Sequence, residues 1–214
     1  KPVRTAIRDD RARSRVYDFV RKEVREGHQA YIVYPVIDET EKLDLKAATR
    51  MADYLAKEIF PDVVVGLVHG RLPADDRDRT MRRFRGGEVQ VLVATTVIEV
   101  GIDVPNATVM VIEHPERFGL AQLHQLRGRV GRGARTSTCI LLVGDKLSES
   151  ARERLKTIYE NADGFRVAEL DLHLRGPGEV LGERQSGVPL LRFADPEKDA
   201  ALIEAARTAA AQLI

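Results

Sequence analysis

The fold class follows from residues 89–112, VQVLVATTVIEVGIDVPNATVMVI. Two apolar runs, 89–94 and 108–112, are rich in β-branched residues and have the length of buried strands. Between them, Gly101 and Pro105 end regular structure. Similar apolar runs at residues 30–37, 63–68 and 137–143 bring the number of predicted strands to five.

Amphipathic segments separate these strands. Apolar residues repeat at helical spacing in residues 16–24 and 48–59, and a helix is predicted to start at Pro73 and to end at Gly86. Continuous apolar strands that alternate with such helices are typical of an α/β fold, with a mostly parallel sheet covered by helices on both faces. Ligands of such sheets bind at the carboxyl ends of the strands.

Composition limits the function classes. The 214 residues are 43% hydrophobic and 31% charged, which excludes a disordered chain. No apolar run approaches the ~18 residues of a membrane span, and the start lacks the apolar stretch of a signal peptide, so we expect a cytoplasmic protein. The single cysteine, Cys139, lies in an apolar run and is interpreted as a core residue.

Charge is balanced overall but not locally. The net charge of +1 gives no whole-chain indication of a nucleic-acid partner. Between Arg117 and Gly144, however, there is no acidic residue, while five arginines fall in that window: Arg117, Arg127, Arg129, Arg132 and Arg135.

Two of these arginines form the first candidate site, within residues 122–133, QLHQLRGRVGRG. Arg129 and Arg132 are three residues apart, so on a helix or a helix-like turn both would project to the same side. A planar, permanently charged guanidinium suits an anion with several oxygens, such as a phosphate chain. The alternative is a solvated basic face with glycines at the helix end.

The second candidate site follows the strand at 89–94. Thr95, Thr96 and Asp103 are predicted at the carboxyl edge of the sheet, where hydroxyls could hold phosphate oxygens and the carboxylate could accept a sugar hydroxyl. The alternative is a turn, with Gly101 in a left-handed conformation and Asp103 as a cap.

These residues carry a family resemblance. Residues 95–105 resemble motif V, and Gln125, Gly128, Arg129 and Arg132 resemble motif VI, of superfamily-two helicases and translocases. The resemblance extends through residues 31–35, the His69–Gly70 loop and residues 118–124. It implies a RecA-like second motor lobe over residues 1–145.

The rest of the chain, residues 146–214, resembles the C-terminal extension of branched-DNA helicases, with a TRG helical hairpin and loop. The resemblance rests on residues 171–179 and 185–187, and it assigns coupling of lobe closure to DNA movement to Arg175, Gly176, Glu179 and Gln185. A transcription-repair coupling translocase, which shares motif VI and a related hairpin, is the alternative within the superfamily.

The resemblance also implies a mechanism. Arg129, Arg132 and Gln125 would act on the phosphates of ATP, Gly101 and Asp103 would lie near its ribose, and Thr95, Thr96, His69 and Gly70 near the DNA backbone. ATP and Mg²⁺ would be held mainly by a first lobe outside this sequence, because no P-loop occurs here and Lys nowhere follows Gly. These 214 residues are therefore expected to hydrolyse no ATP by themselves.

Implied partners are branched double-stranded DNA at stalled replication forks and Holliday junctions, the first lobe and wedge domain of the same chain, and a single-stranded-DNA-binding protein. The implied location is the bacterial nucleoid, and the processes are recombination and DNA repair. No membrane partner is expected. Two other classes stay open: a non-enzymatic nucleic-acid-binding module, and a self-contained nucleotide-binding enzyme. The five histidines lack paired metal-ligand spacing, so no metal site is expected.

Overall fold

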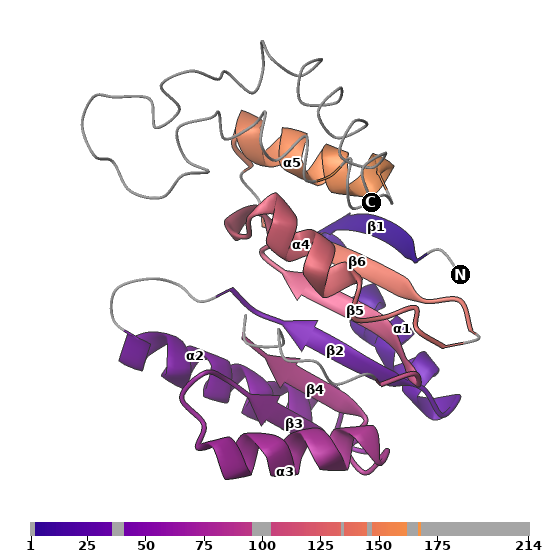
Figure 1. Ribbon diagram of the computed structural model, residues 1–214, viewed down its shortest axis with the longest axis vertical. Helices are drawn as coiled ribbons and strands as arrows, with labels where there is room; N and C mark the ends of the chain where they lie inside the picture. Colours follow the sequence, from indigo (N-terminus) through magenta and orange to yellow (C-terminus); the bar gives the residue numbers. More distant parts are fainter. Residues whose placement is uncertain are drawn as a thin grey trace, which may run out of the picture. The chain divides into compact units, whose positions relative to one another are not determined.

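A six-stranded parallel sheet forms the centre of the protein (Figure 1). The computed structural model describes residues 3–35, 41–95, 104–133, 135–144, 147–161 and 167, with the backbone alone over 41–47. Within these residues the strand order is β1-β6-β5-β2-β4-β3. The strands are β1 (Arg4–Asp9), β2 (Gln29–Val33), β3 (Val65–Val68), β4 (Val91–Ala94), β5 (Ala107–Glu113) and β6 (Thr138–Val143).

The predicted α/β class and parallel sheet are confirmed, but the predicted number of strands is wrong by one. Strand β1 pairs in parallel with β6, with Arg4 opposite Thr138 and Asp9 opposite Val143. Its sequence, RTAIRD, has no continuous apolar run, and none of its residues is fully buried. An edge strand has a neighbour on one side only, so its sequence need not be apolar.

Helices cover both faces of the sheet, as predicted. Helices α1 (Arg13–Arg25) and α2 (Glu41–Tyr54), which continues as a π-helical turn, η2 (Leu55–Ile59), pack on the face that carries Ala30 and Ile32. The opposite face carries Tyr31, whose ring lies 4.9 Å from that of Phe84 in α3 (Ala74–Arg85). Figure 1 shows α3 and α4 (Leu120–Arg127) in front of the sheet and α1 behind it. Short 3₁₀ turns, η1 (Asp10–Ala12) and η3 (Pro115–Arg117), precede α1 and α4.

Helix α5 (Glu149–Glu160) is the last helix with described bounds. Its N-cap is Ser148, whose Oγ accepts a hydrogen bond of 3.2 Å from the Ala151 amide. The helix packs against α4, η3 and β1. The chain divides into two compact units, Lys1–Ala168 and Glu169–Ile214, so α5 belongs to the first unit although the sequence assigns it to the extension. The assignment of 146–214 as a C-terminal extension stays a prediction.

The interpretation of Cys139 as a core residue is confirmed. Its side chain is buried in β6, and burial raises the pKa of the thiol to about 12. A thiol that is protonated and inaccessible at neutral pH is no nucleophile. Separately, none of the helices in the described part of the chain is long and apolar enough to cross a membrane.

Candidate functional site

The arginine-rich candidate site is built on α4. The helix starts after Gly119, whose amide donates to Gln122 Oε1 at 2.9 Å, half of a capping box. Leu120, Leu123 and Leu126 form its buried face. Gln125 is on the exposed side of the same helix. The leucines therefore fix the helix on the sheet and leave Gln125 accessible.

Arg129 and Arg132 lie on a turn that follows α4 rather than on the helix itself. Gly128 caps α4, and the Arg129 amide continues the helical pattern by donating to Leu126 O at 3.0 Å. Val130, only 2% exposed, anchors the turn in the core. Gly131 then adopts a φ of +87°, a conformation that strongly favours glycine, and the chain changes direction before Arg132.

The side chain of Arg132 is held near the beginning of this turn. Its Nε donates to the carbonyl oxygen of Gly128 at 3.2 Å, while the side chain as a whole is exposed. Arg129 is half-buried. The left-handed Gly131 interrupts helical geometry between the two arginines. That both side chains project to the same side stays a prediction. We name residues 128–133 the arginine turn.

The end of the arginine turn packs tightly against the segment that precedes β5. A Cβ atom added at Gly133 would lie 2.5 Å from the carbonyl oxygen of Pro105. Only glycine fits at this distance. Because Pro105 lies two residues before the first residue of β5, this contact places Gly133 at the amino edge of the sheet.

Other candidate residues lie at the opposite, carboxyl edge. Val68 pairs with Ala94 at the ends of β3 and β4, so the next residues, His69 and Thr95, follow neighbouring strands at this edge, and Gly70 follows His69. The Thr95 amide donates to Val68 O at 3.2 Å. His69 Nδ1 accepts from the Arg71 amide at 3.3 Å, and desolvation lowers the pKa of its imidazole.

The candidate residues therefore form two groups at opposite ends of the strands. His69, Gly70 and Thr95 form the carboxyl-edge group, and the arginine turn ends at the amino edge. The sequence placed Thr95 correctly, but one ligand crevice at the carboxyl edge does not describe both groups. Thr96, Gly101, Asp103, Arg175, Gly176, Glu179 and Gln185 lie outside the described residues, and their roles stay predictions.

Arg127, which the sequence analysis assigned no role of its own, is buried beside the arginine turn. Only 6% exposed, its guanidinium donates to the carbonyl oxygens of Ile158 and Asn161 and contacts the His124 ring. Desolvation lowers its pKa. In the sequence, Arg127 cannot be distinguished from the other arginines of this Arg- and Gly-rich segment, so its burial was not predicted.

A second buried charge was also missed. Glu113, the last residue of β5, is 0% exposed, and its Oε1 accepts from Arg13 Nη1 at 2.7 Å and from the Tyr17 hydroxyl at 2.9 Å. Burial and the neighbouring carboxylate of Glu113 raise the pKa of Tyr17 to about 12. These contacts join the first turns of α1 to β5 across about a hundred residues, a pairing with no local sequence signal.

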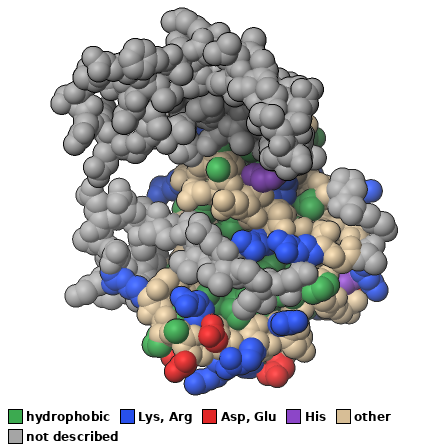
Figure 2. Space-filling model, viewed as in Figure 1, with side chains coloured by type: hydrophobic (Ala, Val, Ile, Leu, Met, Phe, Trp, Pro, Cys, Tyr) green, Lys and Arg blue, Asp and Glu red, His purple; other side chains and the backbone are tan. Residues whose placement is uncertain are grey.

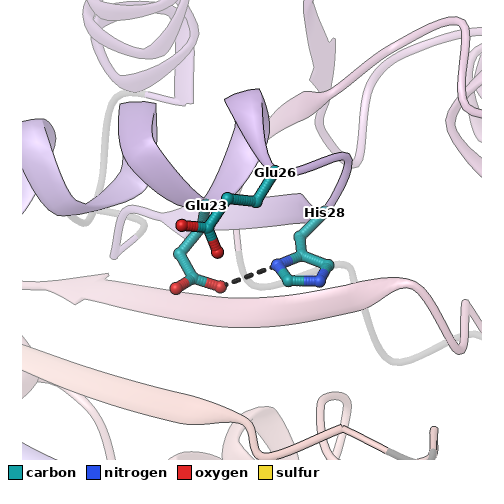
Figure 3. Close-up of side chains that lie close together, drawn as sticks. All are labelled: Glu23, Glu26 and His28. Carbon is teal, nitrogen blue, oxygen red and sulfur yellow. Dashed lines mark hydrogen bonds and ion pairs between the residues drawn. The ribbon is translucent and has the colours of Figure 1, made fainter.

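One group of side chains has metal-ligand composition. Ligand atoms of Glu23, Glu26 and His28 lie within 4.8 Å of one another (Figure 3). Arg135 Nη1 lies 2.6 Å from His28 Nε2, and since a guanidinium can only donate, Nε2 accepts and Nδ1 carries the proton that binds Glu23 Oε2 at 2.8 Å. Both ring nitrogens are thus engaged, and the nearby guanidinium disfavours a cation. The expected lack of a metal site stays a prediction.

On the face seen in Figure 2, the charged side chains of the described residues lie in groups. Figure 2 shows blue Lys and Arg side chains in separate patches, with red Asp and Glu side chains among them at the lower end of the view, where Figure 1 has α3. Ion pairs such as Arg79–Asp76, at 3.4 Å, belong to this helix. Within the acid-free window, Arg127 is buried and donates to backbone carbonyls, and Arg135 contacts the buried His28 ring, so these two guanidinium groups have partners within the protein.

Comparison with protein-family descriptions matches two parts of the chain. Residues 12–134 match the helicase conserved C-terminal domain, and residues 161–214 match domain 3, C-terminal, of the ATP-dependent DNA helicase RecG. The first match contains the arginine turn and the carboxyl-edge group. The second begins at Asn161, immediately after α5.

Curated relatives are ATP-dependent DNA helicases named RecG. The Thermotoga maritima protein is 57% identical over 90% of this chain, and the Bacillus subtilis protein is 48% identical over 94%. The chain spans 24% and 29% of their lengths, about a quarter of each.

Solved structures agree with the fold. A structure described as RecG bound to a three-way DNA junction matches 95% of this chain at 51% identity with a TM-score of 0.75, and the chain covers 26% of it. A variant of S. cerevisiae Dbp5 bound to RNA and ADP BeF3, at 19% identity and a TM-score of 0.53 over 81% of this chain and 44% of that one, shares the fold alone. The chain therefore belongs to the helicase conserved C-terminal domain family, and its similarity over nearly its whole length is to RecG helicases.

Proposed function

We propose that this chain is the second motor lobe, with its C-terminal extension, of an ATP-dependent helicase that remodels branched DNA. The observation that carries the proposal is the arginine turn within a chain that is similar to RecG over nearly its whole length. The turn presents an exposed Arg132 three residues after Arg129, within a window from Arg117 to Gly144 that contains no acidic residue. Such a turn is suited to the phosphates of a nucleotide bound by another lobe.

In this function Arg129 and Arg132 stabilise negative charge on the phosphates, while the exposed Gln125 helps to position them. Mg²⁺, held mainly by the other lobe, would neutralise charge between the phosphates. An arginine placed this way contributes on the order of 10³ to 10⁵ in rate. Lobe closure around ATP therefore controls hydrolysis, because only closure brings the guanidinium groups to the reacting phosphate.

The carboxyl-edge group would contact the DNA backbone. The exposed Gly70 offers a backbone N–H donor, and a phosphate backbone accepts such donors without regard to sequence, whereas Thr95 is only 6% exposed. In the proposal Thr96 extends this group, and Gly101 and Asp103 lie near the nucleotide ribose. The separation of the two described groups at opposite edges of the sheet supports distinct sites for nucleotide and DNA.

The C-terminal extension would convert lobe closure into movement of duplex DNA, with Arg175, Gly176, Glu179 and Gln185 in the coupling loop. The substrates would be replication forks and Holliday junctions in the bacterial cytoplasm, at the nucleoid. A single-stranded-DNA-binding protein remains a proposed partner. These assignments rest on the similarity to RecG, because the coupling residues lie outside the described part of the chain.

The test is Arg132→Ala in the full-length parent protein. We expect the DNA-dependent kcat for ATP hydrolysis to fall by about 10³-fold, since a finger of this kind acts mainly in the transition state. The matched control is Arg117→Ala, an exposed arginine from the same acid-free window. Wild-type turnover in the Arg132 variant would refute the assignment of the arginine turn, and a parent without DNA-dependent hydrolysis would favour a non-enzymatic DNA-binding module.

A further inference from the structure

A buried arginine at the end of α4 has no place in the proposed hydrolysis reaction. Arg127 is only 6% exposed, whereas arginines are almost never fully buried unless their donors are engaged. It is the last residue of α4 and precedes the arginine turn directly. Its side chain lies in the contact between α4 and α5.

The contacts of Arg127 concentrate on the end of α5. Its Nη1 donates to Ile158 O at 2.6 Å and to Asn161 O at 2.9 Å. The last four carbonyl groups of a helix have no partner within the helix, and Ile158 O is one of them. A guanidinium at this position both satisfies the carbonyls and interacts favourably with the negative end of the helix dipole.

A third contact fixes the plane of the guanidinium. Arg127 Nη2 lies 3.0 Å from His124 Nδ1, one turn earlier on α4. Because Arg127 can only donate, this His124 nitrogen is the acceptor. The side chain is therefore held by its own helix and by α5 at once, so a movement of the end of α4 is transmitted to α5 without a flexible link.

The two ends of this connection lie at informative places in the chain. On one side, Arg127 is separated from Arg129 by Gly128 alone. On the other side, Asn161 is the C-cap of α5 and the first residue of the segment that matches RecG domain 3. One side chain thus joins the end of α4, next to the arginine turn, to the residue at which the match to RecG domain 3 begins.

We propose that Arg127 is a positioning residue that couples the arginine turn to α5, and through α5 to the C-terminal extension. This inference rests on the proposed function, because it requires that ATP binding moves the arginine turn. When the arginine turn moves toward the phosphates, Arg127 draws the C-terminal end of α5 with it. Arg127 itself contacts neither nucleotide nor DNA in this scheme.

The first experiment uses Arg127→Lys in the full-length parent. Lysine keeps the charge but replaces the rigid fork with a single flexible ammonium, which cannot bridge His124 and both carbonyls. We expect kcat and KM for ATP to stay within about threefold of wild type, and the base pairs of a three-way junction unwound per ATP to fall by about tenfold or more. The matched control is Arg152→Lys, an exposed arginine of α5, which should change neither quantity.

Hydrolysis and unwinding separate the possible outcomes. Equal losses of both in Arg127→Lys would overturn the proposal, because they would indicate a role in catalysis or folding. Unchanged unwinding per ATP would overturn it as well. If the wild-type parent shows no DNA-dependent hydrolysis, the proposed function is refuted. If the wild-type parent hydrolyses ATP and unwinds the junction, and the Arg127→Lys variant does so equally well, only the role of Arg127 is refuted.

A second measurement does not depend on the unwinding assay. Amide hydrogen exchange of α5 is followed in the wild-type parent with and without a non-hydrolysable ATP analogue. We expect the analogue to change exchange at residues 156–161, and the change to be lost in Arg127→Lys. No change in the wild-type protein, despite saturation with the analogue, would overturn the coupling, as would an undiminished change in a folded Arg127→Lys protein.

Discussion

Replacement of Gly133 by alanine tests whether the arginine turn is held in position by its contact with Pro105. The added Cβ would lie 2.5 Å from the Pro105 carbonyl oxygen, and Cβ atoms do not approach other atoms closer than 3.0 Å. The turn or the Pro105 segment must therefore shift by at least about 0.5 Å. Both are backbone, so no side chain can rotate away to relieve the contact.

The displacement acts on the residue next to Gly133, which is Arg132. A misplacement of about 1 Å in a positioned catalytic group can reduce the rate by about 10²-fold. For the smaller shift expected here, we predict that the DNA-dependent kcat of the full-length parent decreases roughly 10- to 100-fold. The stability of the protein should fall by only about 1–3 kcal/mol, as for other overpacked sites.

The assay is steady-state ATP hydrolysis with saturating three-way junction, together with thermal unfolding of the same samples. Gly128→Ala is the matched control, because its φ is −70° and an added Cβ would make ordinary contacts, 3.4 Å from Gln125 O. A Gly133→Ala enzyme with wild-type kcat would refute the reasoning. So would an equal loss in Gly128→Ala, since the loss could then not be assigned to Pro105.

Two further predictions concern the buried network around Glu113. Arg13→Met leaves the carboxylate of Glu113 buried without its cation, which should lower the free energy of unfolding of the 214-residue chain by about 3 kcal/mol, the low end for a broken buried pair because Arg13 is 30% exposed. In urea unfolding, Arg13→Met combined with Glu113→Gln should be less destabilised than the sum of the single variants, and strict additivity would contradict the pairing. Tyr17→Phe tests the raised pKa of Tyr17. The folded protein keeps the phenol proton to a pH of about 12, whereas the unfolded chain loses it near pH 10. The contribution of the protonated phenol to the free energy of unfolding is therefore intact below pH 10 and is lost between pH 10 and 12. The variant should show a shallower loss of stability over that interval, and an identical pH profile would show that Tyr17 does not titrate with folding.

Much of the fold could be predicted from local sequence. The apolar runs around Val91–Ala94 and Ala107–Glu113 are buried on both faces of the sheet, which is why hydrophobic periodicity alone identified them. Strand β1 was not predicted because one of its edges has no neighbouring strand, and its sequence, RTAIRD, has neither a continuous apolar run nor an alternating pattern. Arg129 and Arg132 were found because their spacing is local, and Gln125 was added by the resemblance to motif VI; all three lie within about two helical turns of chain.

Hydrogen bonds and ion pairs between residues far apart in the chain could not be predicted from the sequence. It identified the arginine turn, but the assignment of Arg127 to α5, of Arg135 to His28 and of Glu113 to Arg13 depends on contacts across 31 to 107 residues. Such contacts form only when helices have packed on the sheet, since no local periodicity encodes which charged group will lose its water. The same packing sends the arginine turn to the amino edge of the sheet and leaves His69 and Thr95 at the carboxyl edge. Local spacing therefore pointed to the candidate residues, whose roles stay predictions, and packing of the folded lobe decided that Arg127 is buried while Arg132 is exposed.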